Sequence, residues 1–315
     1  MATPALRALR EGLPGERIVY GCRPYVRALL EGLPWHDEVL LEADGRWVGI
    51  RDLRAGRFDA AVLMPSSFGS AFAAWAAGIP RRVGHAGHGR SCLLTDVLPA
   101  RAAPSYMGGL YLELAGRMGC RAEAAPMALP ASGAQEARAE AIWTGLGLAG
   151  RRVAGLVPGA AYGSAKCWPP GHFATLARLL RERMDGPALL LCGPGEAGIA
   201  EAIRAGAPGA VVEADPSRVD LGVLKALVRR LAVAVTNDTG PRHIAEAQGV
   251  PTVTLVGPMD PRYTDSGNPR VTVLREPVDC SPCNERACPI DHRCLVRITP
   301  ERVMAAVGTA LGRTA

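Results

Sequence analysis

Residues 232–248 read AVAVTNDTGPRHIAEAQ, and this stretch decides the fold class. An apolar run of strand length passes through a polar turn into a helical pattern that opens with Pro241. A strand joined in this way to a covering helix is the building unit of a parallel α/β sheet. The same unit recurs along most of the chain, so the sequence predicts an α/β fold.

The second half of the chain repeats the strand–helix unit. Short apolar runs predict strands over residues 153–157, 188–192, 209–213, 232–236 and 251–256. Amphipathic periodicity predicts helices over residues 172–184, 196–205, 221–231, 241–248 and 300–311. Because strands and helices alternate, we expect a parallel sheet with both faces covered, and ligands at the carboxyl ends of its strands.

The first half shows the same alternation. Strands are predicted over residues 16–22, 38–42 and 59–64, and helices over residues 23–31, 47–55 and 69–77. Thr3 is placed to cap a helix that starts at Pro4. Residues 117–147 read as a linker followed by a helix from Gln135. We therefore predict two Rossmann-like domains, residues 1–148 and 149–315, that face each other across a cleft.

The composition excludes several classes of protein. Hydrophobic residues make up 48% and charged residues 21% of the 315 residues, which excludes a disordered or fibrous chain. Aromatic residues make up 5%, too few for the stacking platforms of single-strand nucleic-acid binders, so no nucleic-acid partner is predicted. The net charge of +6 fits a solvated basic surface, or a surface for a phosphorylated substrate or an anionic membrane. No secretion signal or membrane span is recognisable, which predicts a cytoplasmic protein.

The loop VPGAAYGSAKCWPP, residues 157–170, carries residue types suited to phosphate binding. Ala160 and Ala161 are small, so the backbone N–H groups can approach an anion closely, and the following helix start adds a partial positive charge. Lys166 adds a full positive charge. The alternative is an ordinary Gly-rich turn.

A second polar loop, residues 236–243, follows the strand quoted at the outset. The Asp238 carboxylate and the Thr239 hydroxyl are placed to hold sugar hydroxyls or phosphate oxygens, beside Gly240. His243 lies one turn into the helix and faces the same place. The alternative is that Asp238 and Thr239 only cap the helix.

Two further clusters carry chemistry. Four of the nine cysteines, with His292 among them, offer ligands for a structural zinc ion, with free or redox-active thiols and disulfides as the alternatives. These are Cys280, Cys283, Cys288 and Cys294. Five basic residues in the first half are suited to a phosphorylated acceptor, or form an exposed basic loop. These are Arg81, Arg82, His85, His88 and Arg90.

The two polar loops, with three further stretches, resemble one protein family. P-G-A…A-K-x-W-P at residues 158–169 and T-N-D-[ST]-G-x-x-H at residues 236–243 are similar to motifs of glycosyltransferase family 9, the ADP-heptose–lipopolysaccharide heptosyltransferases. Residues 79–85, 93–96 and 249–258 resemble other segments of that family, so the resemblance covers nearly the whole chain. Within the family, the pattern looks most like the heptosyltransferase II branch.

The resemblance implies a GT-B fold and an inverting, metal-independent transfer of heptose from ADP-heptose to the lipopolysaccharide inner core, on a lipid A-linked acceptor. It places the acceptor in the first domain and the nucleotide sugar in the second. Lys166 would neutralise the leaving diphosphate, Asp238, Thr239 and Gly240 would contact heptose and phosphates, and His243 would support them. Glu196 matches a position that holds the ribose. Ala160 and Ala161 stand where relatives carry hydroxyl residues, so only backbone contacts to phosphate are expected there.

The resemblance also sets expectations about the start of the chain and about alternatives. The predicted catalytic residues are Lys166 and Asp238, whereas the family's general base is an Asp in a loop ahead of the helix that here begins at Thr3. That base and the first strand are thus expected upstream of Met1. The alternatives are a family-9 enzyme with another sugar or acceptor, and a non-catalytic nucleotide-sugar-binding protein. An enzyme of this kind is expected to contact the inner membrane peripherally.

Overall fold

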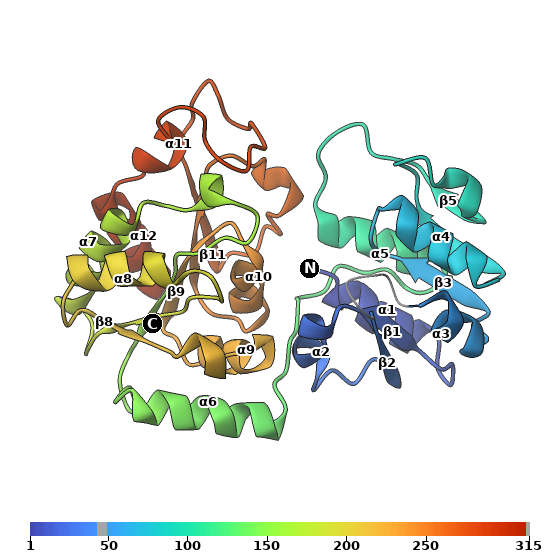
Figure 1. Cartoon of the computed structure of the whole chain (residues 1–315), viewed down its shortest axis with the longest axis horizontal. Helices are drawn as coiled ribbons and strands as arrows, with labels where there is room; N and C mark the ends of the chain where they lie inside the picture. Colours follow the sequence, from blue (N-terminus) through green and yellow to red (C-terminus); the bar gives the residue numbers. More distant parts are fainter. Residues whose placement is uncertain (43–48, 313–315) are drawn as a thin grey trace. The chain divides into compact units, whose positions relative to one another are not determined.

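The computed structural model describes residues 1–42 and 49–312. They fold into two compact units (Figure 1). The first unit is Met1–Ala128 with Arg262–Thr264, and the second is Leu129–Pro261 with Asp265–Ala315. All strand pairs among the described residues are parallel, as the sequence predicts. No helix in these residues is both long enough and apolar enough to span a bilayer.

The second unit contains one continuous parallel sheet with the strand order β11-β10-β9-β6-β7-β8. Its strands are β6 (Ala154–Val157), β7 (Ala188–Leu190), β8 (Val211–Glu213), β9 (Val233–Asn237), β10 (Thr252–Val256) and β11 (Val271–Arg275). Every residue of β6, β9 and β10 is buried. Apolar runs such as AGLV and TVTLV are suited to this position, because a central parallel strand has both faces covered.

Helices cover both faces of this sheet. They are α6 (Gly133–Gly145), α7 (Pro170–Arg181), α8 (Ala197–Gly206), α9 (Leu221–Arg229), α10 (Gly240–Ala247), α11 (Arg293–Val296) and α12 (Pro300–Gly312). Side chains of α7, α8 and α12 pack with Leu156 and Val235 in the main core. On the other face, the side chain of Leu231, just after α9, lies so close to Gly155 in β6 that a Cβ there would be 2.3 Å from it. The layers are therefore those of a doubly wound domain.

The first unit forms two smaller sheets. Strands β1 (Val19–Cys22) and β2 (Glu38–Leu41) form one, and β3 (Ala60–Leu63), β4 (Arg81–His85) and β5 (Asp96–Leu98) form the other. Its helices are α1 (Thr3–Gly12), α2 (Pro24–Leu30), α3 (Ile50–Ala55), α4 (Phe68–Ala76) and α5 (Met107–Arg117). Helices α1 and α5 pack together through Ala5, Leu9 and Ala115.

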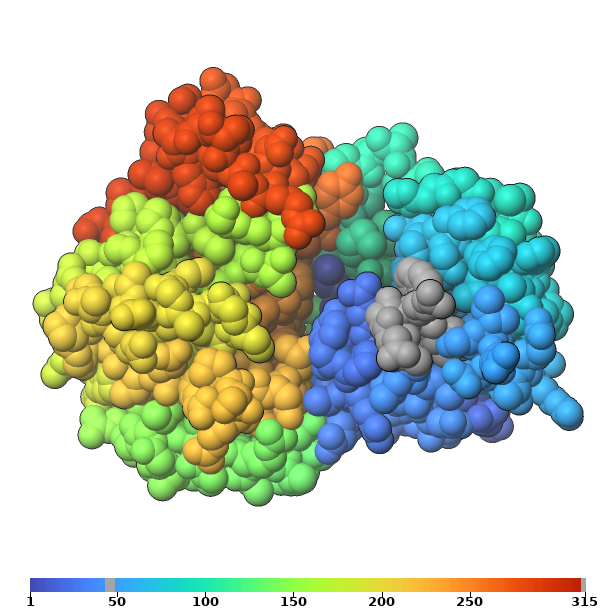
Figure 2. Space-filling view, in the orientation of Figure 1, coloured from blue at the N-terminus to red at the C-terminus, as the bar shows by residue number. Residues whose placement is uncertain are grey.

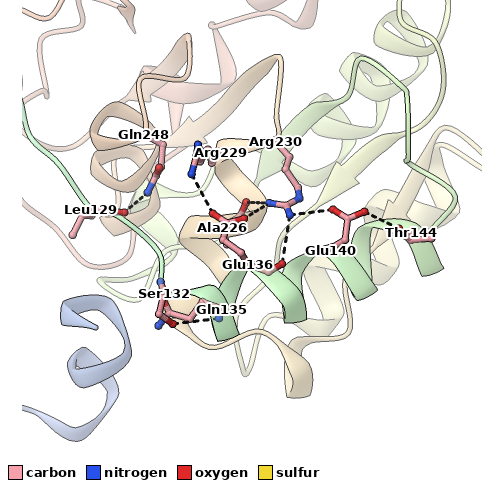
Figure 3. A network of polar contacts seen from close by, with 10 residues as sticks. All are labelled: Leu129, Ser132, Gln135, Glu136, Glu140, Thr144, Ala226, Arg229, Arg230 and Gln248. Atoms are coloured by element: carbon pink, nitrogen blue, oxygen red, sulfur yellow. Dashed lines mark hydrogen bonds and ion pairs between the residues drawn. The ribbon is translucent and has the colours of Figure 1, made fainter. Parts of the chain in front are cut away.

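The boundary between the units lies at residues 128/129, ahead of the predicted boundary at 148/149. The reason is α6, which packs on α9 of the second unit (Figure 3). Arg230 donates to Glu136 at 2.6 Å and to Glu140 at 3.1 Å, and both carboxylates lie on α6. Ser132 and Gln135 form a reciprocal capping box at the start of that helix.

Some elements differ from the predictions. The sequence interpretation missed β4, β5, α5, β11 and α11. The helix predicted over residues 47–55 begins at Ile50, and residues 47 and 48 lie outside the described residues. The prediction that Thr3 caps the first helix is wrong, because the N-cap is Ala2 and the Thr3 hydroxyl instead accepts a hydrogen bond from the Ala128 N–H at 3.2 Å.

Candidate functional site

The predicted site residues lie on loops that follow three neighbouring strands of the second unit. β6 pairs with β9 on one side and with β7 on the other. The loop after β6 carries Lys166, the loop after β7 carries Glu196, and the loop after β9 carries Asp238. Because parallel strands end at the same edge of the sheet, their polar side chains meet there.

Lys166 and Asp238 are in direct contact across two of these loops. Lys166 ends a short 3-10 turn, η2 (Ser164–Lys166), and its Nζ donates to the Asp238 carbonyl at 2.9 Å. The same Nζ lies 3.4 Å from Asp238 Oδ2, and the side chains are 12% and 4% exposed. The structure therefore joins the two predicted catalytic residues in one nearly buried ion pair.

Arg242 is a second cation on Asp238, and the sequence interpretation missed it. Its Nη1 lies 2.9 Å from Asp238 Oδ1, one turn into α10, and the Arg242 side chain is fully buried. Burial alone would raise the pKa of Asp238, but Lys166 and Arg242 outweigh this and lower the pKa below its usual range. Asp238 is thus ionised at neutral pH and is held by two cations.

Asn237, the last residue of β9, ties the loops together and was also missed. Its Nδ2 donates to the Pro158 carbonyl at 2.6 Å, and its Oδ1 accepts from the Trp168 N–H at 3.1 Å. The Asn237 side chain is buried, so these bonds satisfy its amide. The signal in the sequence was a polar amide at the end of an otherwise apolar strand.

Helix α10 begins within one residue of the predicted start, but the Thr239 side chain does not cap it. Thr239 is the N-cap residue, yet its side chain makes no capping hydrogen bond, and Gly240 beside it is exposed. His243 Nδ1 lies 3.9 Å from Glu246 Oε2. Burial lowers the pKa of His243, against the opposing effect of Glu246, so this imidazole is held in its neutral form.

Glu196 and the Ala160–Ala161 loop are brought together through a glycine. Glu196 Oε2 accepts from the Gly193 N–H at 2.7 Å, which fixes the carboxylate at the start of α8. A Cβ at Gly159 would lie 1.9 Å from the Glu196 carboxylate carbon, so only glycine allows this approach. Ala160 is half-buried and Ala161 is exposed, and neither side chain has a polar atom to offer a ligand.

The cysteine cluster does not form a metal centre in this structure. All nine cysteines are free, so no disulfide forms among them. Within residues 1–42 and 49–312, no three His, Cys, Asp or Glu side chains converge closely enough to hold a metal ion. Burial, followed by the nearby Cys280 and Cys288 thiols, raises the pKa of Cys294 to about 11. Zinc at Cys280, Cys283, Cys288 and Cys294 stays a prediction.

The basic cluster of the first unit is largely used inside the fold. Arg90 is buried and donates to the carbonyls of His85 and Pro65. Arg82 donates to the Leu93 carbonyl at 2.6 Å. Arg81 pairs with Asp96, and His85 contacts the Leu110 carbonyl at 3.0 Å. His88 and the Arg81 side chain reach solvent, while Arg82 and His85 are half-buried and Arg90 is buried, so the five residues do not form a continuous cationic rim.

Comparison with known proteins gives a consistent result. Residues 46–293 match the model of glycosyltransferase family 9 (heptosyltransferase). Lipopolysaccharide heptosyltransferase 2 of Escherichia coli is 30% identical, over 99% of this chain and 94% of that protein. Lipooligosaccharide heptosyltransferase 2 of Haemophilus influenzae is also 30% identical, over 82% and 78% of the two chains.

Solved structures agree with this result and with the predicted GT-B fold. The ADP-heptose lipopolysaccharide heptosyltransferase II of E. coli superposes with a TM-score of 0.81 at 26% identity, covering 99% of this chain and 95% of that one. A family-9 glycosyltransferase from Veillonella parvula has a TM-score of 0.84 at 22% identity, covering 99% and 93%, and supports the fold alone.

Proposed function

This chain belongs to glycosyltransferase family 9, and on that premise we propose that it transfers heptose from ADP-heptose to the inner core of lipopolysaccharide. Relatives whose names state this activity match 99% of the length of this chain. The observation that carries the proposal for this molecule is the Lys166–Asp238 pair at the carboxyl ends of β6 and β9. The Lys166 ammonium group of this pair is a cation held in place at the edge of the sheet where α/β domains bind nucleotides.

We assign Lys166 to the diphosphate of the donor. Two of its three N–H donors are directed at Asp238 in the described structure, and the third is the one we assign to a phosphate oxygen. The backbone N–H groups of Thr239 and Gly240 at the start of α10 would add partial positive charge there. Negative charge builds on the diphosphate as the glycosidic bond breaks, so these groups stabilise the leaving group.

Asp238 has a positioning role in this proposal. Because two cations hold it ionised, its pKa is far from that of a base working near neutral pH. It keeps Lys166 in place through both its carbonyl and its carboxylate. The carboxylate of Glu196, fixed by the Gly193 N–H, is assigned to the ribose hydroxyls of the donor, and the buried His243 supports the start of α10.

The proposal includes inversion at the anomeric carbon and no metal requirement for transfer. Lys166 supplies the charge that a divalent cation would otherwise bring to the diphosphate. Transfer should therefore continue unchanged in the presence of a chelator. Loss of transfer on chelation, with recovery on adding a divalent cation, would contradict this part.

The test is transfer from ADP-heptose to lipopolysaccharide from a heptose-deficient strain. Lys166→Ala should reduce kcat/KM by about 10²-fold or more, because a charge-assisted contact to the leaving diphosphate is lost. Arg183→Ala, which removes an exposed cation from the same unit, is the matched control and should be unaffected. Binding of ADP-heptose without any transfer would support the alternative of a non-catalytic binding protein. Transfer of another sugar only would support the other family-9 alternative.

We also propose that helix α4 is the surface that contacts the membrane holding the acceptor. Ser70, Ala71, Ala73 and Ala74 form its buried face, while Phe68, Phe72 and Trp75 are 47%, 41% and 50% exposed. The Phe68 and Phe72 rings lie 6.2 Å apart and the Phe72 and Trp75 rings 5.7 Å apart, so they form one aromatic stripe.

The neighbourhood of the aromatic stripe favours the interface of an anionic bilayer as its partner. Helix α3 packs beside α4 and carries Arg51 and Arg54, both exposed. Arg54 Nη2 donates to the Ala76 carbonyl at 2.7 Å, which holds its guanidinium at the end of the stripe. Aromatic rings next to arginine are typical of segments that lie in the headgroup region.

Sedimentation with vesicles containing anionic phospholipid tests this surface. Trp75→Ser with Phe72→Ser should abolish vesicle binding, while Tyr25→Ser, which removes another exposed aromatic of the same unit, should leave it unchanged. Equal binding by both variants would contradict the proposal. A dimer in solution that only the first variant dissociates would show that a second copy covers the stripe.

A further inference from the structure

The segment that carries the four clustered cysteines contacts the loop that carries Lys166. We call residues 280–294 the cysteine loop; it lies between β11 and α12 and includes the start of α11. Figure 2 shows this red segment on the surface of the second unit, directly above the lime-green segment that contains residues 160–166. Nothing in the motif containing Lys166 predicts this neighbour.

Four hydrogen bonds join the cysteine loop to the Lys166 loop. The Ala165 N–H donates to the Arg286 carbonyl at 3.1 Å, and His292 Nε2 donates to the Ala165 carbonyl at 2.7 Å. The Tyr162 hydroxyl donates to the Asn284 carbonyl at 2.6 Å, and Arg286 Nε donates to the Tyr162 carbonyl at 2.9 Å. Both polar backbone groups of Ala165, the residue before Lys166, are therefore held by the cysteine loop.

Close packing accompanies these bonds. A Cβ at Gly163 would lie 2.2 Å from the Arg286 carbonyl oxygen, so no side chain fits there while the loops are in contact. The Tyr162 ring lies 5.2 Å from Lys166 Nζ and 5.7 Å from the Arg286 guanidinium carbon, close enough for cation–π attraction to both. The two loops thus share one aromatic ring.

The cysteine loop is in turn fixed to the sheet. The N–H groups of Cys283 and Asn284 both donate to the Pro258 carbonyl at 3.0 Å. The Ser281 hydroxyl donates to the Gly257 carbonyl at 2.6 Å. Gly257 and Pro258 directly follow β10, so the loop connects the end of that strand to the loop after β6.

We infer that the cysteine loop is a positioning element for Lys166, with Arg286 and His292 as its positioning residues. The cysteine loop bonds the backbone of η2, and Asp238 bonds the Lys166 ammonium group itself. The ammonium group therefore keeps one position before the donor arrives. Pre-organisation of this kind strengthens binding because the ordering cost has already been met in the free protein. This inference rests on the proposed function, since it assigns the diphosphate to Lys166.

Calorimetric binding of ADP to the full chain, with matched variants, tests the inference. Gly163→Ala should separate the loops and weaken ADP binding about tenfold, whereas Gly147→Ala, also at a positive φ but with nothing within 4 Å of its Cβ, should have no effect. His292→Ala should weaken binding about fivefold to tenfold, and His292→Gln, which keeps an N–H donor, should restore most of it. Arg286→Ala, which removes the bond to the Tyr162 carbonyl, should also weaken ADP binding. Its control is Arg293→Ala, because the partners of Arg293 lie within the cysteine loop and its flank.

A double-mutant cycle separates positioning from a general loss of structure. In a Lys166→Ala background, Gly163→Ala and His292→Ala should cause less than about a twofold further loss, because they act through the missing lysine. Full additivity, or no effect of either variant while Lys166→Ala weakens binding, would overturn the inference. If Lys166→Ala leaves ADP binding unchanged, or the wild type does not bind ADP, the proposed function fails, and the inference with it.

Discussion

The sheets of the two units differ, although both units are built from the same strand–helix pattern. In the second unit, β6 and β9 lie inside one continuous six-stranded sheet and are fully buried. In the first unit the described strands form separate sheets of two and three strands, and β1 has no buried residue. β3 has one, at Leu63.

This difference explains where the candidate site lies. In the continuous sheet, three adjacent strands end side by side, so Lys166, Glu196 and Asp238 are brought to one edge. The same edge supplies a buried amide, Asn237, that fixes the loops. The first unit spreads its strand ends over two sheets and instead presents an exposed aromatic helix face. We therefore propose donor binding at the second unit and membrane contact at the first.

The sharpest test of the comparison uses two aspartates that each bridge two cations. Asp238 holds Lys166 and Arg242 and is 4% exposed, whereas Asp96 holds Arg81 and Arg117 and is 18% exposed. Asp238→Ala should lower the free energy of unfolding of the second unit by about 3–5 kcal/mol, because a buried arginine and a nearly buried lysine lose the carboxylate that they share. Asp96→Ala should cost the first unit much less, because its arginines reach water. Hydrogen exchange measured over a series of urea concentrations gives the unfolding free energy of each unit separately. Equal losses of unfolding free energy in the two units would contradict the expected difference.

Shortening one apolar side chain in a strand of each unit should likewise cost the second unit more unfolding free energy than the first. Leu156 in β6 is fully buried, so Leu156→Ala should cost about 2–5 kcal/mol of unfolding free energy. Val62 in β3 is only half-buried, so Val62→Ala should cost about 1 kcal/mol. Thermal or urea unfolding of the two variants provides the measurement. A larger loss from Val62→Ala would mean that the first unit's sheets are packed more tightly than their burial indicates.

The smallest expected effect is a pH dependence that is specific to the second unit. Burial lowers the pKa of His243 below 6.5, so the unfolded chain takes up this proton first as the pH falls. Stability should therefore be fully present above about pH 6.5 and decline below it, with a slope of at most ~1.4 kcal/mol per pH unit for one proton. His243→Gln should flatten this slope in the second unit. His36→Gln, the matched change in the first unit, should leave the second unit's profile as it is, and identical profiles for wild type and His243→Gln would refute the assignment.

The sequence predicted the second unit better than the first for a physical reason. Fully buried parallel strands must be continuous apolar runs, and such runs are visible without tertiary information, as in residues 232–236. Strand β4 reads RRVGH and is only partly buried, so its residues do not alternate or cluster in a way that marks a strand. Helix α5 contains Gly108 and Gly109, which lower its intrinsic helix propensity. Both were missed.

The site shows the same division between local and tertiary information. Lys166 and Asp238 could be singled out because loops between strands and helices have a known relation to ligands. Glu196 was singled out only by the resemblance to family 9. Asn237 could not, since its partners Pro158 and Trp168 lie far along the chain. Arg242 lies only four residues after Asp238, but its complete burial is visible only in the structure. The contact of His292 with Ala165 spans 127 residues and leaves no local pattern.

Hydrogen–deuterium exchange of the full chain with and without ADP-heptose tests the central claim most directly, namely that the edge of the continuous sheet binds the donor. Peptides covering residues 158–168, 193–197 and 236–243 should become protected on binding, and peptides of the first unit's sheets should not change. Lys166→Ala should remove most of that protection at the same ligand concentration. Protection confined to residues 1–128, or unchanged exchange in all three loops at saturating ADP-heptose, would contradict the claim.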